Sequence, residues 1–524
     1  MKKLMILALL AVALMLLAAC GNNEDEHTGD GLHLTWYINY DWFSAMPFPN
    51  PTNAGEVWLH ENKNLSITFM DPAGAPAQRL STMILDRDFP DVLTVERGQD
   101  LDRLLLADAL VPIDEFLPGS NLEKFLGMDL LNMFRSPDGY IYTIPNWAIG
   151  EGFANGNFGW MINEYYYNAL GRPPLNTFDD LHAYLTLVRE QFPNVLPMHI
   201  GENLAGASLI FGGMAENNNP GFWGERVYNQ GNQLVSFLEN PLTVETFLFV
   251  NRLYRENLIQ QDLFTMTGDQ RRELIRNGSV AVLCLTNVLD STGEMAALAA
   301  ENPDMTYLAI PPLVAAGVNP NNMYSGSHTR MGWNVAVISV DAADPQATFE
   351  MLDWMFGNEG QLVFAYGPPG DFYDFGEYTP EGFPIRMNDA FFDAPGYEIT
   401  GRWSDANWVG NTSFIDGMGI HLYNQGADVS WTTVVQIHYI WPFSADATEL
   451  SGLAPGFNTP EGIIYQDLDL LYRQAIPSIV LAPSEEAVRA NIANYIDELY
   501  ANGLQQLLNY QTAVWLANRA ALGR

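Results

Sequence analysis

Lysine is almost absent from this chain of 524 residues: there are only four, and two of them are Lys2 and Lys3. With 24 basic and 62 acidic side chains, the formal net charge is -38. Nucleic acids and anionic membrane surfaces are bound by basic faces, so this balance argues against both as the main partner. A solvated acidic surface keeps a secreted protein soluble, but it does not identify a partner.

Cysteine is also scarce, with only Cys20 and Cys284 in the chain. Cys284 lies inside the apolar run 280–285, where it is predicted to be a buried small hydrophobic residue. Nothing near it in the sequence would lower the pKa of its thiol, so we expect neither a redox nor a catalytic role.

Motifs for catalysis and for metal binding are missing. The sequence has no P-loop, no G-x-S-x-G, no H-E-x-x-H and no Ser-x-x-Lys. The eight His are scattered, and Ser136–Gly139 lacks the preceding acids of a calcium loop. We therefore expect no enzymatic activity, no metal site and no cofactor. A pair of carboxylates as in a polysaccharide hydrolase stays open, because 62 acids make such a pair impossible to exclude by counting.

The chain has one long apolar run, from Leu4 to Ala19, which follows the two N-terminal lysines. It is shorter than the roughly 20 residues of a membrane-spanning helix, and its pattern predicts a signal peptide over residues 1–19. The small residues before Cys20 resemble a bacterial lipobox. We expect Cys20 to become the lipidated N-terminus, held at the outer face of a membrane by acyl chains such as palmitate, and residues 20–31 to be a tether. In the alternative, the peptide is cut after Ala19 and Cys20 is a bystander.

The rest of the chain predicts a large α/β protein. Hydrophobic residues make up 48% and aromatic residues 12%, and single cores stop growing at roughly 250–300 residues, so we expect more than one unit. Strands and helices alternate at the start, which favours a largely parallel sheet. The predicted strands are 32–38, 65–69, 89–95, 140–145, 279–283, 305–310 and 333–339; the predicted helices are 77–85, 101–110, 181–190, 348–356 and most of the chain after Ser484.

Seven segments in a fixed order resemble one family. Besides the lipobox they are Phe89–Val92, Asp138–Pro145, Trp160–Asn163, 170–180, Arg276–Val282 and 352–367. Together they resemble the bacterial extracellular solute-binding proteins of family 1, which are lipoprotein components of ABC importers for oligosaccharides. The long LplA-like lipoproteins are the most similar in pattern. The chain departs from the family where Asn163 replaces the usual Arg and where a Lys-rich surface is missing.

The resemblance implies a type II periplasmic-binding-protein-like fold, with two discontinuous α/β lobes joined by a hinge. Such lobes close over a ligand, and a permease engages the closed form. The expected boundaries are 32–155 for the first part of lobe 1 and 156–324 for the first part of lobe 2. Residues 325–385 are expected to return to lobe 1, and 386–524 to complete lobe 2 and form C-terminal helices. A monomer is expected.

Candidate ligand contacts come from the chemistry of sugars, which present an apolar C–H face and a rim of hydroxyls. Tyr40, Asp41 and Trp42 follow the first predicted strand, and ligands of open α/β sheets lie beyond the carboxyl ends of strands. Further candidates lie where the chain is expected to cross between the lobes: Trp147, Trp160, Trp223, Trp403, Asp405 and Trp408. Each of these side chains has packing within or between the lobes as its alternative.

Five other conspicuous residues have mostly structural interpretations. Trp354 and Trp515 lie in helical stripes and are expected in the core. Trp333 opens a strand near a crossing and is compatible with either role. Arg97 and Arg330 are more readily explained by ion pairs with nearby acids than by contacts with a ligand.

Three functions remain compatible with the sequence. The first is capture of a carbohydrate for an ABC importer. The second is the same scaffold binding a peptide or another small solute. The third is a surface-anchored polysaccharide hydrolase, which turnover of a bound glycan would distinguish from the other two.

Overall fold

The structure is a computed structural model that describes residues 31–524 except 377, 380, 381, 385, 395–397, 399, 400 and 457. The predictions of a signal peptide, of a lipidated Cys20 and of most of the tether therefore lie outside the described residues. In the described part of the chain, no helix combines the length and the apolarity that crossing a membrane requires.

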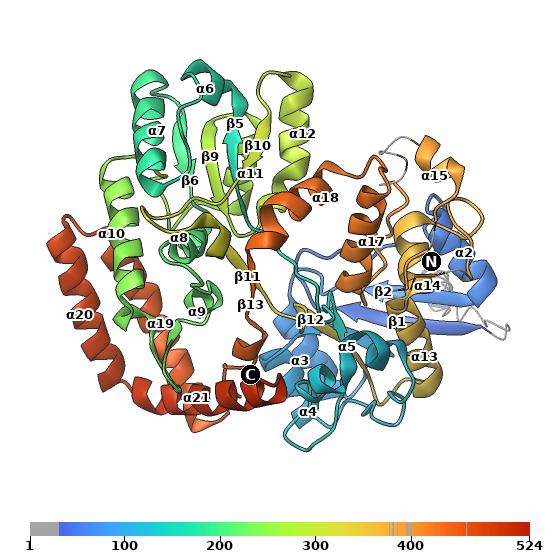
Figure 1. The fold of residues 1–524 in the computed structure, drawn as a ribbon. Coiled ribbons are helices and arrows are strands. Elements are labelled where there is room, and N and C mark those ends of the chain that lie inside the picture. Colours follow the sequence, from blue (N-terminus) through green and yellow to red (C-terminus); the bar gives the residue numbers. More distant parts are fainter. Residues whose placement is uncertain are drawn as a thin grey trace, which may run out of the picture.

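Lobe 1 is built on a five-stranded sheet of order β2-β1-β3-β12-β4 (Figure 1). β1 pairs in parallel with β2 and β3, while β12 runs antiparallel to β3 and β4. The strands are β1 (Leu32–Ile38), β2 (Leu65–Met70), β3 (Val92–Glu96), β4 (Thr143–Asn146) and β12 (Asn334–Ile338). The helices are α2 (Ala54–Lys63), α3 (Pro76–Asp86), α4 (Gln99–Leu106), α5 (Asn121–Asn132), α13 (Pro345–Phe356) and α14 (Asn358–Tyr366).

Lobe 2 is built on a four-stranded sheet of order β10-β5-β9-β6, with C-terminal helices packed beside it (Figure 1). β9 pairs in parallel with β6 and antiparallel with β5. The strands are β5 (Gly159–Asn163), β6 (Leu196–His199), β9 (Val280–Leu285) and β10 (Tyr307–Ile310), with the hairpin β7 (Val227–Gln230) and β8 (Gln233–Ser236). The helices are α6 (Glu164–Ala169), α7 (Phe178–Gln191), α8 (Ala207–Gly213), α9 (Gly221–Gly224), α10 (Pro241–Arg255), α11 (Gly268–Arg276), α12 (Thr292–Glu301), α19 (Pro460–Val480), α20 (Glu485–Ala501) and α21 (Leu504–Ala521).

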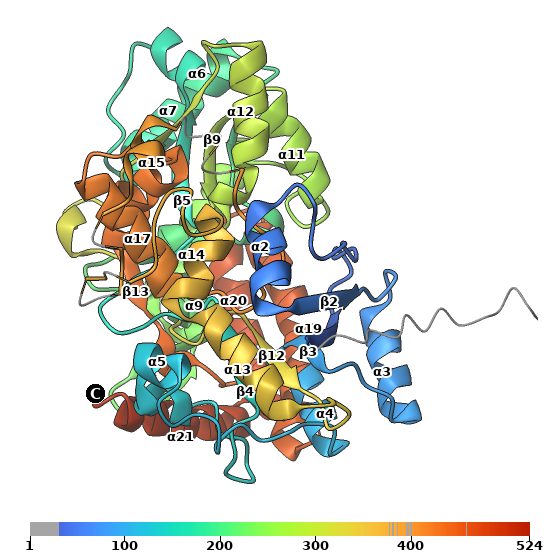
Figure 2. The same ribbon diagram turned by 90° about the vertical axis from the view of Figure 1, so that its right-hand side faces the viewer.

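The chain crosses between the lobes more than once, as the family resemblance implies. β11 (Gly326–His328) on one crossing pairs in parallel with β13 (Ser444–Asp446) on another. A helical segment lies between the sheets and contains α15 (Asp389–Asp393), α17 (Thr412–Asn424), α18 (Trp431–Val435) and a π-helix (Gln436–Ile440). Figure 2 shows α6, α7, α11 and α12 of lobe 2 at one end of the molecule, and α4 and α5 of lobe 1 together with α21 at the other.

Local sequence chemistry sets where the elements begin. The predicted capping box of α7 is present: Thr177 accepts a hydrogen bond from the Asp180 backbone, and the Asp180 side chain accepts one from the Thr177 backbone. The first strand is confirmed as Leu32–Ile38. A helix at Ala54–Lys63 was not predicted; the Asn53 side chain caps it by accepting from the Glu56 N–H.

The two large hydrophobic cores confirm two lobes, and a third, small core packs around α17; one predicted boundary differs from these cores. The core of lobe 1 includes Ala406, Trp408 and Val409, which the sequence assigned to the completion of lobe 2. The chain leaves lobe 1 later than residue 385 because the 404–411 loop hydrogen-bonds to α14 and β4, for example through Gly410 N–H to Asn146 Oδ1 at 2.6 Å. The next residue of the chain that belongs to the core of lobe 2 is Val435.

Candidate functional site

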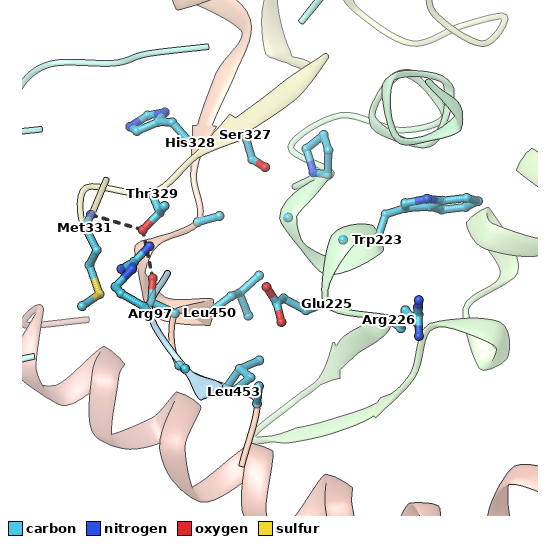
Figure 3. A pocket seen from close by; sticks show the side chains of 18 of the residues that line it. Arg97, Trp223, Glu225, Arg226, Ser327, His328, Thr329, Met331, Leu450 and Leu453 are labelled. Atoms are coloured by element: carbon cyan, nitrogen blue, oxygen red, sulfur yellow. Dashed lines mark hydrogen bonds between the residues drawn. The ribbon is translucent and has the colours of Figure 1, made fainter. Parts of the chain in front are cut away.

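A cavity of about 960 Å³ lies between the two lobes. We call it the interlobe cavity (Figure 3). Lobe 1 contributes the turn between β3 and α4, and lobe 2 contributes α9 and the segments at the carboxyl ends of β6 and β9. The β11 crossing and α19 complete the wall. Ligands of open α/β sheets bind at such carboxyl ends, and the volume is that of a small-molecule site.

Arg97 and Glu225 face the interlobe cavity from opposite lobes (Figure 3). Arg97 donates from Nη2 to the carbonyl of Gly332, which fixes the guanidinium at the end of β3. Burial lowers the pKa of Arg97 to about 10, so the side chain is still charged at neutral pH. Glu225 is open to the cavity, yet the surrounding walls raise its pKa to about 7, and the charges of Arg226 and Arg97 only partly offset this.

The other polar side chains of the interlobe cavity differ in whether they already have a partner within the protein or can bind a ligand. Arg226 is engaged, because it pairs with Asp469 at 2.7 Å and lies over the Tyr472 ring. Asn203 is exposed in the left-handed conformation, with φ 50°, and its side chain has no hydrogen-bond partner within the described part of the chain. Tyr465 on α19 borders the cavity with 37% of its surface exposed. Asn203 and Tyr465 are therefore free to bind a ligand.

Four aromatic residues gather at the carboxyl edge of the lobe 1 sheet, and we call them the aromatic cluster. Their ring centroids lie 5.0 to 6.5 Å apart. The members are Tyr40, Trp42, Trp333 and Trp408. Tyr40 and Trp408 are buried, whereas Trp42 is 61% exposed and Trp333 is 44% exposed. The buried rings thus support Trp42 and Trp333, which each expose a flat apolar face to solvent. Trp333 directly follows Gly332, whose carbonyl accepts the hydrogen bond from Arg97.

A second aromatic pair lies at the end of β4. Trp147 and Trp403 stack with their ring centroids 5.9 Å apart and an interplanar angle of 13°. Trp147 has φ 58°, a left-handed conformation that bulky residues rarely adopt, and its N–H donates to Gly410 O at 2.7 Å. Gly410 permits this approach, because a Cβ there would lie 3.1 Å from the Trp147 indole.

Two predicted contacts pack in or against the core of lobe 2. Trp160 is 1% exposed within β5 and does not line the interlobe cavity. The prediction is wrong for this side chain because the strand opens the second lobe with its indole turned inwards. Trp223 borders the cavity, but its ring packs against Phe211, Phe237 and Phe247 and points away from Glu225 (Figure 3).

The structure confirms some of the expectations for the other named residues and contradicts others. Asp41 and Asp405 are exposed beside Trp42 and Trp403 respectively. Trp515 is fully buried, as predicted, but Trp354 is only partly buried and stacks on Trp58. The ion pairs predicted for Arg97 and Arg330 are not found among the described residues, since both guanidinium groups donate to backbone carbonyls.

The sequence did not single out Asn203, Glu225 or Tyr465. Arg97 and Gly98 follow the end of a predicted strand, which is the same signal that pointed to Tyr40 and could have ranked Arg97 higher. The wall formed by α19 depends on tertiary packing of a segment that begins at Pro460, 150 residues after the lobe 2 sheet ends at Ile310, so no local pattern reveals it. Within the described residues, no group of three or more His, Cys, Asp or Glu side chains is placed to hold a metal ion.

Comparisons with known proteins agree with this architecture. The model of the bacterial extracellular solute-binding protein family matches residues 52–362. The S. pneumoniae ABC-transporter substrate-binding protein FusA, solved in complex with kestose, is 15% identical with a TM-score of 0.64, over 93% of this chain and 100% of that one. A solute-binding protein of Bifidobacterium longum infantis, described as HMO-binding and ABC-transporter-associated, is 15% identical with a TM-score of 0.62, over 93% and 99%.

The alginate-binding protein AlgQ2, solved without calcium ion, is 17% identical with a TM-score of 0.59, over 93% of this chain and 98% of that one. No curated protein sequence gives a significant match. At these identities the solved structures establish the fold, which is that of the type II periplasmic binding proteins. The family model covers more than half of the chain, and with the two-lobed fold and its cavity the conclusion follows: the chain belongs to the bacterial extracellular solute-binding protein family.

Proposed function

We propose that this protein is a lipid-anchored extracellular receptor that captures an oligosaccharide in the interlobe cavity and delivers it to the permease of an ABC importer. The observation that carries the proposal is the cavity itself. It brings together hydrogen-bonding groups from both lobes. Two exposed tryptophan faces, Trp42 and Trp333, lie outside its lining, at the carboxyl edge of the lobe 1 sheet. A hydroxyl-rich ligand with an apolar face needs both kinds of group.

The relatives support the same ligand class. Kestose is bound in the FusA structure, and AlgQ2 is named as an alginate-binding protein. Arg97 and Glu225 lie on different lobes, so a ligand that contacts both side chains stabilises the closed arrangement over the open one. In this proposal the lobes close on the sugar, and the permease engages the closed form.

Calorimetric titration of residues 27–524 tests the proposal. The panel contains neutral oligosaccharides, uronic-acid oligosaccharides and peptides, and each glycan is analysed for cleavage after the titration. We expect one glycan class to bind once per chain and to be recovered intact. Binding of peptides alone would overturn the ligand class, and release of shorter glycans would show a hydrolase.

Replacing Trp42 by Ala is expected to weaken carbohydrate binding by about 2 kcal/mol, or about 30-fold, because an exposed stacking face is lost. The thermal midpoint should stay nearly unchanged, because Trp42 is 61% exposed. Titration calorimetry and a thermal melt measure the two quantities. Trp58→Ala is the matched control: Trp58 also belongs to lobe 1, but it stacks on Trp354 and lines neither the cavity nor the cluster. A stability loss for Trp42→Ala without a loss of affinity would assign Trp42 to packing.

Lipid anchoring predicts a large shift in location when Cys20 is replaced by Ser. Acyl chains contribute about 0.8 kcal/mol for each buried CH₂, so the anchored protein should sediment with membranes and the variant should be soluble. Labelling with a fatty-acid analogue before fractionation measures both effects. Cys284→Ser, which removes the other cysteine, should leave labelling unchanged. Equal labelling of wild type and Cys20→Ser would contradict the anchor.

A further inference from the structure

A second cavity of about 460 Å³ lies in the helical segment between the lobes. We call it the α17 cavity. One wall comes from α14, α15 and α17, and the other from α18 and the π-helix that follows it (Figure 1). On the first wall, Phe391 and Leu422 belong to a small core. The elements of the second wall are anchored elsewhere: Val435 of α18 and Ile440 of the π-helix do not line the cavity but belong to the core of lobe 2. The α17 cavity therefore lies between two separately packed parts of the molecule.

Aspartate 416 makes this cavity unusual. Asp416 lines it, and its Oδ2 is buried without a hydrogen-bond partner. An unsatisfied buried carboxyl destabilises a fold, and it leaves a strong hydrogen-bond acceptor directed at the cavity. Burial alone raises the pKa of Asp416 to about 8. The charge of Asp416 in turn contributes to the raised pKa of Tyr366, after the larger effect of burial.

The rest of the lining has aromatic rings and acids but no cation. Tyr366, Phe391, Trp403 and Trp441 supply aromatic rings, and Asp428 supplies a second carboxyl at the exposed rim. Among the described residues, no Lys, Arg or His lines the α17 cavity. Aromatic faces and a carboxylate together attract a cation, and the net charge of -38 adds a favourable field.

We propose that the α17 cavity binds an organic cation, an ammonium-bearing small molecule whose charge is met by the Asp416 carboxylate and whose alkyl groups lie against the aromatic rings. This site is separate from the interlobe cavity. Because its walls belong to two packed parts, an occupant bridges α17 and the segment that returns to lobe 2. Binding of the cation is non-covalent, so no covalent bond forms or breaks.

Choline and its neutral isostere 3,3-dimethylbutan-1-ol are the probes for this proposal. We expect residues 27–524 to bind choline at least about tenfold more tightly than the isostere, because only choline carries the charge. Choline is permanently cationic, so any pH dependence comes from the protein. The titratable groups lining the cavity with Asp416 are Tyr366 and Asp428. Affinity for choline should rise about tenfold per pH unit from pH 6 to 8, because binding requires the ionised carboxyl.

The variant Asp416→Asn keeps the shape of the side chain and removes the charge. It should weaken choline binding by about tenfold or more, and Trp58→Ala should leave it unchanged. Equal binding of choline and its isostere, undiminished binding by Asp416→Asn, or absence of choline binding would each overturn the proposal. A neutral sugar that competes with choline for this cavity would also overturn it. Carbohydrate binding by the interlobe cavity is measured separately, so the two proposals fail independently.

Discussion

The variant Trp160→Ala should lose about 3–5 kcal/mol of unfolding free energy, the range for removing a large buried aromatic side chain. Trp160 is 1% exposed and lies in the middle of the lobe 2 sheet, paired with Cys284 on one side and with Ile310 on the other. The cavity left behind cannot collapse, because the strand is held from both sides. Urea unfolding followed by circular dichroism measures the loss.

Ligand affinity distinguishes this packing role from the one first predicted for Trp160. Where the variant is still folded, its affinity for the bound carbohydrate should equal that of the wild type within about twofold. Trp160→Phe is the control, because it keeps most of the buried volume and should lose much less stability. Normal stability combined with lost affinity would return Trp160 to the ligand site.

The second large effect is a gain in stability for Asp416→Asn at alkaline pH. The pKa of Asp416 is raised to about 8 in the folded protein, whereas the unfolded chain has the ordinary aspartate pKa near 4. Between these values the unfolded chain is ionised while the folded protein keeps its proton, so wild-type stability falls as pH rises from about 4 to 8. Asparagine cannot ionise, and the variant avoids this loss.

Near pH 9 the variant should be more stable than the wild type by about 3–5 kcal/mol, and near pH 4 the difference should vanish. Thermal melts across this pH range measure the difference. Asp428→Asn is the matched control, because Asp428 lies on the exposed rim of the same cavity and should change stability by no more than about 0.5 kcal/mol. A pH-independent effect of Asp416→Asn would mean that its carboxyl is not isolated from water.

A carboxyl that destabilises the empty protein is also the group on which the proposed cation site depends. Stability and function commonly conflict at binding sites, because groups placed for a ligand remain unsatisfied without it. The same variant should therefore be more stable and bind choline less well. If Asp416→Asn were less stable than the wild type, or if it bound choline more tightly, the destabilising role of this carboxyl and its role in cation binding would not both hold.

The sequence predicted much of the fold because the period of apolar residues and the capping residues are local signals. The strand Leu32–Ile38, the capping box at Thr177 and the helices after Ser484 were all visible in this way. The late return of the chain to lobe 2 was not, since it depends on contacts such as the hydrogen bond between Gly410 and Asn146, which lie far apart in the chain.

Strand ends are local signals as well, but the predicted contacts at the end of the first strand do not line the interlobe cavity. Tyr40 and Trp42 lie at the end of a strand, and strand ends are readable from sequence. Whether an indole faces solvent or core is decided by tertiary packing: Trp42 is 61% exposed, but Trp160 is 1% exposed. Composition alone cannot separate these two residues, and the roles of Glu225 and Asn203 required the assembled cavity.

Hydrogen–deuterium exchange tests most directly the central claim that a carbohydrate is held between the lobes. With a carbohydrate from the titration panel bound, amide exchange should slow on both sides of the interlobe cavity: at residues 97–105 of lobe 1 and at 203–209 and 223–226 of lobe 2. Segments remote from the cavity, such as α3, serve as internal controls. Slowed exchange confined to one lobe, or no slowing by any carbohydrate of the panel, would contradict the account.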